Sequence, residues 1–171
     1  QQLADNRVDE RHVRRRGEPL DALTPGQHGR PGEAQEHRLG EVRVAGFHLP
    51  HQAAAVRQRL GVVEHLPLLY GDLSAEENLR FYGRLYGLRS LEGRMGEVLD
   101  LIGLSHRRKD LVRTFSRGMQ QRLAIGRSIL HNPDVLLLDE PHTGLDQDAC
   151  QMLDATLARV AGEGWTIVMT S

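Results

Sequence analysis

The feature that most constrains the fold is a short apolar run that ends in two acidic residues. Val135–Leu138 reads V-L-L-L, and Asp139 and Glu140 follow it directly. A strand that is apolar on both faces is typical of the centre of a parallel sheet. Residues 147–161 then repeat apolar side chains at the spacing of an amphipathic helix, and residues 165–170 form another apolar run. This strand–helix–strand order predicts an α/β fold with a parallel sheet.

The two acids have a chemical interpretation and a structural one. Carboxylates at the carboxyl end of a central parallel strand lie in the crevice where α/β sheets bind ligands. There Asp139 would hold Mg²⁺, directly or through water, and Glu140 would polarise a water molecule as a general base. In the alternative, a buried strand simply ends in polar residues. These residues by themselves do not separate the two interpretations.

A second candidate site opens the helix predicted at residues 118–130. Ser116, Arg117 and Gly118 come directly before it. The N-terminus of a helix offers free N–H groups and the positive end of the helix dipole, which suits a phosphate. Ser116 would add a hydroxyl group, and Gly118 would allow close approach of the backbone. An ordinary helix-capping serine is the simpler interpretation of these residues alone.

The preceding part of the chain predicts a helical insert at about residues 72–115. Ser74 and Glu77 have the spacing of a capping box at the start of a helix. Gly87 and Gly103 are placed to end two successive helices. The predicted apolar positions are Leu79, Tyr82, Leu85 and Tyr86 on the first helix, and Leu91, Met95, Val98, Leu99 and Ile102 on the second. Shorter elements are expected at 41–46 (strand), 51–59 (helix) and 60–63 (strand).

Composition excludes several classes of protein. A chain of 171 residues can bury a core as one domain, and its net charge of −1 gives no overall attraction to nucleic acid. The single cysteine, Cys150, excludes an internal disulfide framework. No apolar run approaches the roughly 20 residues that span a bilayer, and the chain does not open with a signal peptide. We therefore expect a soluble protein, or one bound peripherally to a membrane partner.

Residues 1–39 differ from the rest of the chain. They contain no aromatic residue, no sustained periodicity and several proline and glycine residues. This composition predicts an irregular or disordered segment. The abrupt change after residue 39 also suggests that the segment derives from a non-native reading frame.

Taken together, the motifs of residues 114–146 resemble those of the ATP-binding subunits of ABC transporters. Phe115-Ser116-Arg117-Gly118-Met119 is similar to the signature loop, which is usually written Leu-Ser-Gly-Gly-Gln. Val135–Leu138 with Asp139 resembles the Walker B strand, Glu140 the catalytic glutamate, and residues 143–146 the D-loop. The resemblance covers about residues 40–171. The insert sequence N-L-R-F-Y-G-R-L-Y-G-L is similar to that of the subfamily that exports haem for cytochrome c biogenesis. Related multidrug or polyketide exporters share parts of this sequence, so the resemblance leaves the cargo open.

The resemblance implies a P-loop NTPase-like parallel sheet of the ABC ATPase type with a helical insert, and ATP and Mg²⁺ as cofactors. It implies a catalytic role for Glu140 and a metal-binding role for Asp139. It also implies a second ABC ATPase subunit in a head-to-tail dimer, a transporter membrane subunit and a place on the inner, cytoplasmic face of the cell membrane. Nucleic acid is not an expected partner. The residues implied to contact nucleotide are Ser116, Arg117, Gly118 and Asp146.

The chain departs from the family pattern at three points. It has no Gly-x-x-x-x-Gly-Lys-Ser/Thr phosphate-binding loop, and its single lysine, Lys109, lies in another region. Leu66 occupies the expected place of the Q-loop glutamine. The switch histidine would follow the last strand. We therefore expect a partial ABC ATPase domain, incomplete at both ends, with impaired ATP hydrolysis. The alternative is a non-catalytic regulatory or docking module on a transporter.

Overall fold

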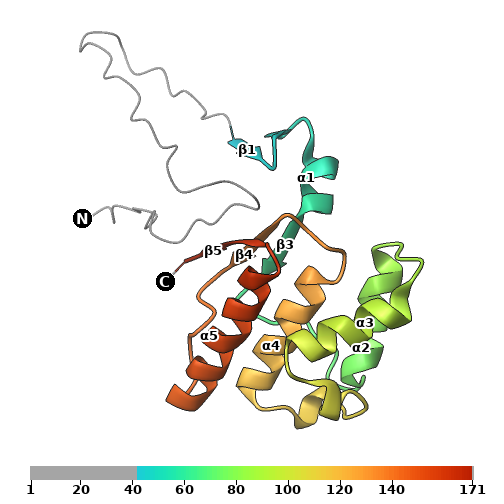
Figure 1. Cartoon of the computed structure of the whole chain (residues 1–171), viewed down its shortest axis with the longest axis vertical. Coiled ribbons are helices and arrows are strands. Elements are labelled where there is room, and N and C mark those ends of the chain that lie inside the picture. The colour runs from blue at the N-terminus through green and yellow to red at the C-terminus, as the bar shows by residue number, and fades with distance from the viewer. Residues whose placement is uncertain (1–41, 171) are drawn as a thin grey trace, which may run out of the picture.

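A computed structural model describes residues 42–170, and Figure 1 shows their arrangement. The centre is a three-stranded parallel sheet of β3 (Leu60–Val63), β4 (Val135–Leu138) and β5 (Thr166–Met169), in the order β3-β4-β5. The predicted parallel sheet with β4 at its centre is confirmed. β4 takes this place because neighbours on both sides complete its backbone hydrogen bonds, while Leu136 and Leu138 are buried.

Two helices, α4 (Arg117–Ile129) and α5 (Gln147–Gly162), lie side by side against the sheet (Figure 1). α4 approaches β3 very closely at Gly61, where an added Cβ atom would lie 2.4 Å from the backbone oxygen of Ser128. That distance is well inside van der Waals contact, so only glycine permits this separation between helix and strand.

Among residues 42–170, side chains rather than another strand cover the outer edge of β3. The carbonyl oxygen of Val63 points inward and accepts from the N–H of Asp139 at 2.9 Å. The carbonyl oxygens of Leu60 and Val62 point the other way. Nε2 of His131 lies 3.3 Å from the first, and Nη2 of Arg127 donates to the second at 3.1 Å. These contacts satisfy an edge that would otherwise be open to pairing with another chain.

The helical insert consists of α2 (Ala75–Leu85) and α3 (Leu91–Leu101), followed by the 3-10 turns Ser105–Arg107 and Val112–Thr114. The predicted capping box is confirmed: the N–H of Ser74 donates to Glu77 Oε2 at 2.7 Å, and the N–H of Glu77 donates to Ser74 Oγ at 3.2 Å. Most of the predicted apolar positions are buried at the junction with α4, namely Leu79, Met95, Val98, Leu99 and Ile102.

Two of the predicted apolar positions, Leu85 and Tyr86, are exposed. Leu85 is 71% exposed, whereas the sequence pattern places it with Leu79 on one face of α2. Six residues advance an α-helix by about 240°, so these two side chains point in different directions. Tyr82 and Tyr86, at three and seven residues from Leu79, lie on the same side as that leucine. Tyr86 is 40% exposed and stacks on the ring of His131 with a centroid separation of 4.2 Å.

The described chain begins with an antiparallel hairpin of β1 (Val42–Val44) and β2 (Phe47–Leu49), followed by α1 (Ala53–Arg59), which leads directly into β3. Expectations for residues 1–39, including the irregular segment and the non-native reading frame, lie outside the described residues. Within residues 42–170, no helix combines the length and apolar character needed to cross a membrane.

Candidate nucleotide site

The acidic end of β4 is organised by a threonine at the end of the neighbouring strand. The Oγ1 of Thr170 donates to Oδ1 of Asp139 at 2.7 Å and accepts from the backbone N–H of Glu140 at 3.1 Å. Thr170 reaches this position because its own N–H pairs with Leu138 O at 3.0 Å, continuing the register between β4 and β5. One hydroxyl group therefore fixes both acids at the carboxyl edge of the sheet.

Glu140 adopts a backbone conformation that side chains rarely take. Its φ is +44°, in the left-handed region, which costs a non-glycine residue on the order of 1–3 kcal/mol when surrounding contacts hold it there. Those contacts include Thr170 and the hydroxyl of Thr143, whose Oγ1 donates to Glu140 Oε2 at 3.1 Å. The carboxylate thus has a defined direction before any ligand binds.

A pocket of about 290 Å³ lies beside this carboxylate. Its lining residues are Glu140, Pro141, His142, Thr143 and Thr170. His142 is held by a residue that does not line the pocket, because its Nε2 lies 2.7 Å from Oδ1 of Asp154 on α5. The pocket therefore combines one acid with two hydroxyl groups and an imidazole ring.

The donor set suits a cation that arrives with phosphate. Oδ2 of Asp139 receives no hydrogen bond from residues 42–170 and is available to a ligand. Those residues contain no group of three or more His, Cys, Asp or Glu side chains that could hold a metal ion. Mg²⁺ often binds through one or two carboxylates plus phosphate oxygens and water, so one Asp139 oxygen matches its needs without a preformed cage.

The residues of the second candidate site lie at the start of α4. Ser116 caps the helix, and its Oγ accepts from the N–H of Met119 at 3.3 Å. Ser116 and Arg117 are exposed, whereas Gly118 is buried against α5. Asp146 caps α5 in the same way, accepting from the N–H of Ala149 at 2.8 Å. The structure thus confirms the predicted helix-capping position of Ser116.

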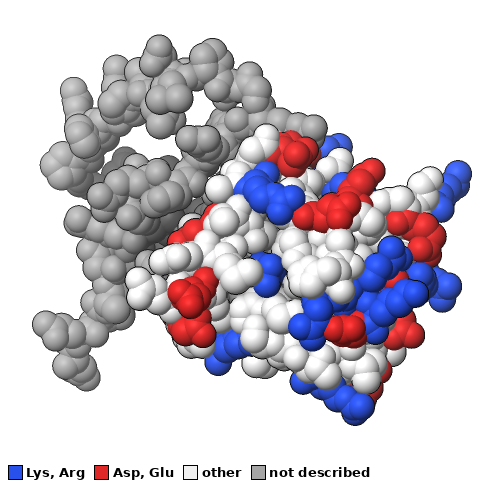
Figure 2. Space-filling view, turned by 60° about the horizontal axis from the view of Figure 1, so that its bottom comes forward, with Lys and Arg blue, Asp and Glu red and all other residues white. Residues whose placement is uncertain are grey.

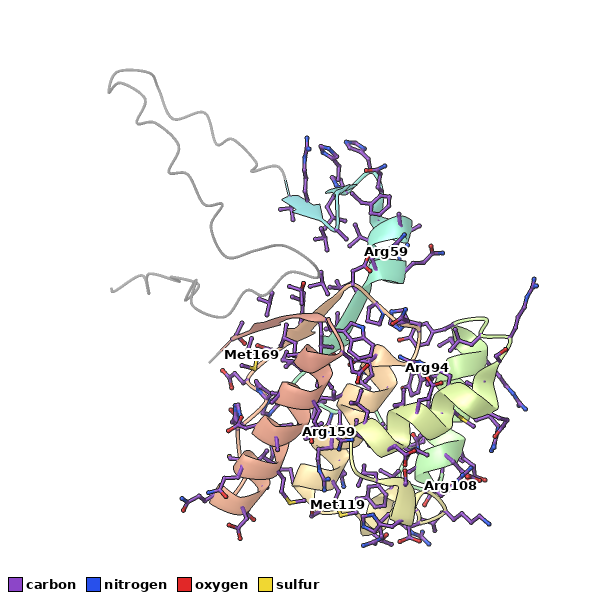
Figure 3. All side chains as sticks on the ribbon, in the orientation of Figure 1. Arg59, Arg94, Arg108, Met119, Arg159 and Met169 are labelled. Atoms are coloured by element: carbon purple, nitrogen blue, oxygen red, sulfur yellow. The ribbon has the colours of Figure 1, made fainter. Side chains whose placement is uncertain are left out.

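The four predicted nucleotide-contacting residues gather at one end of the molecule. In Figures 1 and 3, α4 and α5 begin at the same end, and Met119, labelled in Figure 3, marks the first turn of α4. Ser116, Arg117 and Gly118 come from this turn and Asp146 from the first turn of α5. Asp139 and Glu140 lie at the carboxyl end of the central strand β4, where the segment that leads to α5 begins.

Thr143 and Thr170 were missed as site residues by reasoning from sequence. A signal for Thr170 exists, since polar residues that follow adjacent parallel strands meet at one edge. Thr143 had been assigned only to the D-loop-like turn. Its hydrogen bond depends on the positive φ of Glu140, which a sequence with no glycine there does not reveal.

Comparison with known proteins places this arrangement in a family. Residues 32–143 match the family model described as ABC transporter, and this match covers more than half of the chain. The chain belongs to the ABC transporter family. The matched segment contains the signature-like loop and both acids of the ABC ATP-binding domain.

Individual relatives agree with this assignment. The chain is 37% identical over 137 residues to the linearmycin resistance ATP-binding protein LnrL of Bacillus subtilis, covering 79% of this chain and 44% of that protein. It is 37% identical over 134 residues to the Nod factor export ATP-binding protein I of Cupriavidus pinatubonensis, covering 77% and 41%. The ABC transporter ATP-binding protein NatA of Bacillus subtilis is 36% identical over 139 residues, covering 80% and 56%.

A solved structure of an ATP-binding subunit of an ABC transporter superposes with a TM-score of 0.62 at 29% identity, covering 78% of this chain and 57% of that one. The predicted ABC ATPase fold is therefore confirmed. The chain spans about half the length of the relatives that it matches. None of the three relatives named above is described as a haem exporter, so they give that expectation no support.

Proposed function

We propose that this chain is an ATP-binding subunit of an export-type ABC transporter, belonging to a family of ATP-hydrolysing subunits but impaired in hydrolysis itself. The observation that carries the proposal is the network at the end of β4, where Thr170 and Thr143 orient Asp139 and Glu140. Phosphoryl transfer depends mainly on positioning and charge stabilisation, and this network supplies positioned carboxylates beside an open pocket. The family assignment supports ATP as the ligand.

In a site completed by a phosphate loop, Asp139 would hold Mg²⁺ through its available Oδ2, and the cation would supply positive charge beside the phosphates. In such a completed site, Glu140 would orient the attacking water and accept its proton. Thr143 keeps the Glu140 carboxylate turned toward the pocket. Thr170 restrains one carboxylate oxygen of Asp139 and the backbone N–H of Glu140. The Asp139 carboxylate is thereby positioned for a cation, and the Glu140 carboxylate for water.

The signature-like end would serve a second subunit. Ser116, Arg117, Gly118 and Asp146 lie at the starts of α4 and α5, where a phosphate on a neighbouring chain can approach backbone N–H groups and a cation. The proposed partner is another ABC ATP-binding subunit in a head-to-tail dimer. A nucleotide would then lie between the phosphate loop of that partner and the signature-like loop of this chain.

The membrane subunit has a candidate docking surface on α2. Phe81 and Leu85 are exposed there and help to line a groove of about 620 Å³ that also carries Arg80 and Arg84. Tyr70 packs edge-on against Phe81 at 5.0 Å and extends this apolar surface. Exposed apolar patches of this kind mark contacts with other proteins. Such a contact would place the chain on the inner face of the cell membrane.

Charge gives no support to nucleic acid as a partner. Figure 2 shows acidic side chains among the basic ones on the face it presents. Arg80, Arg108 and Arg113 form ion pairs with Glu92, Glu76 and Asp72 respectively. A nucleic-acid surface needs a continuous basic stripe.

We propose further that this sequence does not hydrolyse ATP at a site of its own. A phosphate loop needs a lysine to reach the β- and γ-phosphates. The single lysine, Lys109, is exposed in the helical insert, beside the start of α2. The chain would then supply its signature-like end to a partner whose phosphate loop is complete. Export as the direction of transport is supported by relatives that are named for Nod factor export.

Phosphate release from MgATP tests the hydrolytic part. We expect the purified chain and its Glu140→Gln variant to release phosphate at the same background rate. Turnover that disappears in Glu140→Gln would overturn the proposed impairment and would assign a complete site to this sequence.

Affinity purification tests the role in a complex. We expect the tagged chain to recover a second ATP-binding subunit in the presence of MgATP, and a Ser116→Arg variant to lose that recovery. Recovery of a membrane subunit alone, with no dependence on nucleotide or on Ser116, would favour the docking-module alternative.

A further inference from the structure

The first turns of α4 and α5 touch through residues without bulky side chains. A Cβ atom placed on Gly118 would lie 2.9 Å from Cβ of Ala149. This separation is shorter than side-chain carbon atoms normally tolerate, so any larger residue at Gly118 would push the two helices apart. The signature-like loop and the turn before α5 therefore form one packed unit.

Arg117 makes a second contact across the same junction. A Cβ atom on Gly144 would lie 2.8 Å from both Cζ and Nη1 of Arg117, and 3.2 Å from its Nε. The guanidinium group thus occupies the space where a side chain of residue 144 would begin. Gly144 also has a φ of +73°, a conformation that favours glycine. Within the described chain, the guanidinium group of Arg117 packs directly against this glycine.

The contact continues from Gly144 to the acid at the end of β4. Thr143, its neighbour in sequence, donates from Oγ1 to Glu140 Oε2 at 3.1 Å. The backbone N–H of Thr143 also donates to the Glu140 carbonyl oxygen at 3.1 Å. An uninterrupted series of contacts therefore runs from Arg117 through Gly144 and Thr143 to Glu140.

We propose that Arg117 is a positioning residue that couples the signature-like loop to the carboxylate of Glu140. Energetic coupling between sites travels through packed side chains and hydrogen bonds that change arrangement together. A ligand that displaces Arg117 from Gly144 frees the turn at residues 143–146 and alters how Thr143 holds Glu140. The functional role of this coupling rests on the proposed function. If that function holds, a nucleotide bound at the partner's site would change the orientation of the Glu140 carboxylate in this chain.

Hydrogen–deuterium exchange of the full chain tests the first link. In Arg117→Ala we expect exchange of the amides at 142–147 to rise roughly fivefold, because local opening of this turn becomes easier. Arg113→Ala is the matched control, since Arg113 is also an exposed arginine near the start of α4 but pairs with Asp72 instead. That control should leave exchange at 142–147 unchanged.

The second link is tested at the carboxylate itself. In protein labelled with ¹³C at glutamate carboxyl groups, the NMR signal of Glu140, assigned with Glu140→Gln, should shift in Arg117→Ala. The same arginine substitution should cause no further shift in a Thr143→Val background. Arg117→Lys, which keeps the charge without the planar guanidinium, should not restore the original signal.

Unchanged exchange at 142–147 in Arg117→Ala, an unmoved Glu140 signal, or full restoration by lysine would each overturn the coupling. Neither measurement contains nucleotide. Failure of the proposed ATP-related function would therefore leave both results in place, and failure of the coupling would leave that function untouched.

Discussion

Replacing Gly61 with alanine tests whether the close approach of α4 to β3 holds the fold together. The added Cβ atom would lie 2.4 Å from Ser128 O and 3.1 Å from Cδ1 of Leu136. Leu136 can adjust its side chain, but the Ser128 oxygen belongs to the backbone of a buried helical turn. Restoring an ordinary contact of about 3.4 Å requires a movement of roughly 1 Å between helix and strand.

The cost follows from what such a movement disturbs. Ser128 is 1% exposed, and its neighbours Ile125 and Ile129 are fully buried, so α4 cannot shift without opening its other contacts. Forcing an extra methyl group into a packed core costs about 1–3 kcal/mol, and a backbone obstacle favours the upper part of that range. Alanine also reduces the entropy of the unfolded chain, which offsets about 0.4–1 kcal/mol. We expect a net loss of about 2 kcal/mol.

Urea unfolding provides the assay. Trp165 is only 8% exposed and packs in the core, so its fluorescence should report global unfolding alongside far-UV circular dichroism. The matched control is Gly96→Ala in α3, where an added Cβ atom would meet nothing within 4 Å. That control should gain roughly 0.5–1 kcal/mol from helix propensity.

A Gly61→Ala variant that is as stable as the parent chain, or that gains stability as Gly96→Ala does, would contradict the expected clash between α4 and β3. Either result would mean that α4 is free to move relative to β3. A lowered midpoint with an unchanged denaturant slope is the expected outcome, because the substitution should alter stability without altering the surface exposed on unfolding.

Three other substitutions probe the core, the helical insert and a buried histidine. Leu138→Ala should lower the free energy of unfolding by about 2–5 kcal/mol, measured in the same urea assay, because Leu138 is 2% exposed and its removal leaves a cavity. Ser74→Ala should cost about 1 kcal/mol by breaking the capping box of α2, whereas Ser90→Ala, at a helix start without a side-chain cap, should cost less. Burial lowers the pKa of His131 below its ordinary value of 6.5, so the unfolded chain binds a proton there first as pH falls. Unfolding free energy should therefore decrease below about pH 6.5, and His131→Gln should reduce that dependence; an unchanged pH slope in the variant would contradict the assignment.

Sequence patterns were sufficient where one local rule decided the outcome. Val135–Leu138 is apolar on both faces and became the central strand. Ser74 and Glu77 carry the capping-box spacing, and both hydrogen bonds form. Leu85 shows the limit of such rules, since its chemistry is apolar but its angle on the helix points it away from the core.

Sequence patterns were insufficient where distant segments meet. Gly61 and Ser128 are separated in the sequence by the whole helical insert, yet their contact sets the distance between α4 and the sheet. Thr170 lies 31 residues from Asp139, and only the pairing of β5 with β4 brings its hydroxyl within 2.7 Å. A single sequence does not show which strands are neighbours. It therefore predicted the two acids as site residues but not the Thr170 hydroxyl group that orients them.

The strain at Glu140 connects these observations to chemistry. A non-glycine residue at positive φ persists only when its surroundings fix it, and here Thr170 holds its N–H while Thr143 holds its carboxylate. The first contact belongs to the sheet and the second to the turn before α5. Glu140 is therefore held by two parts of the molecule. Thr170 belongs to the β4–β5 strand pair, and Thr143 belongs to the turn that packs against the signature-like loop. A change in either contact should reorient the acid without unfolding the domain.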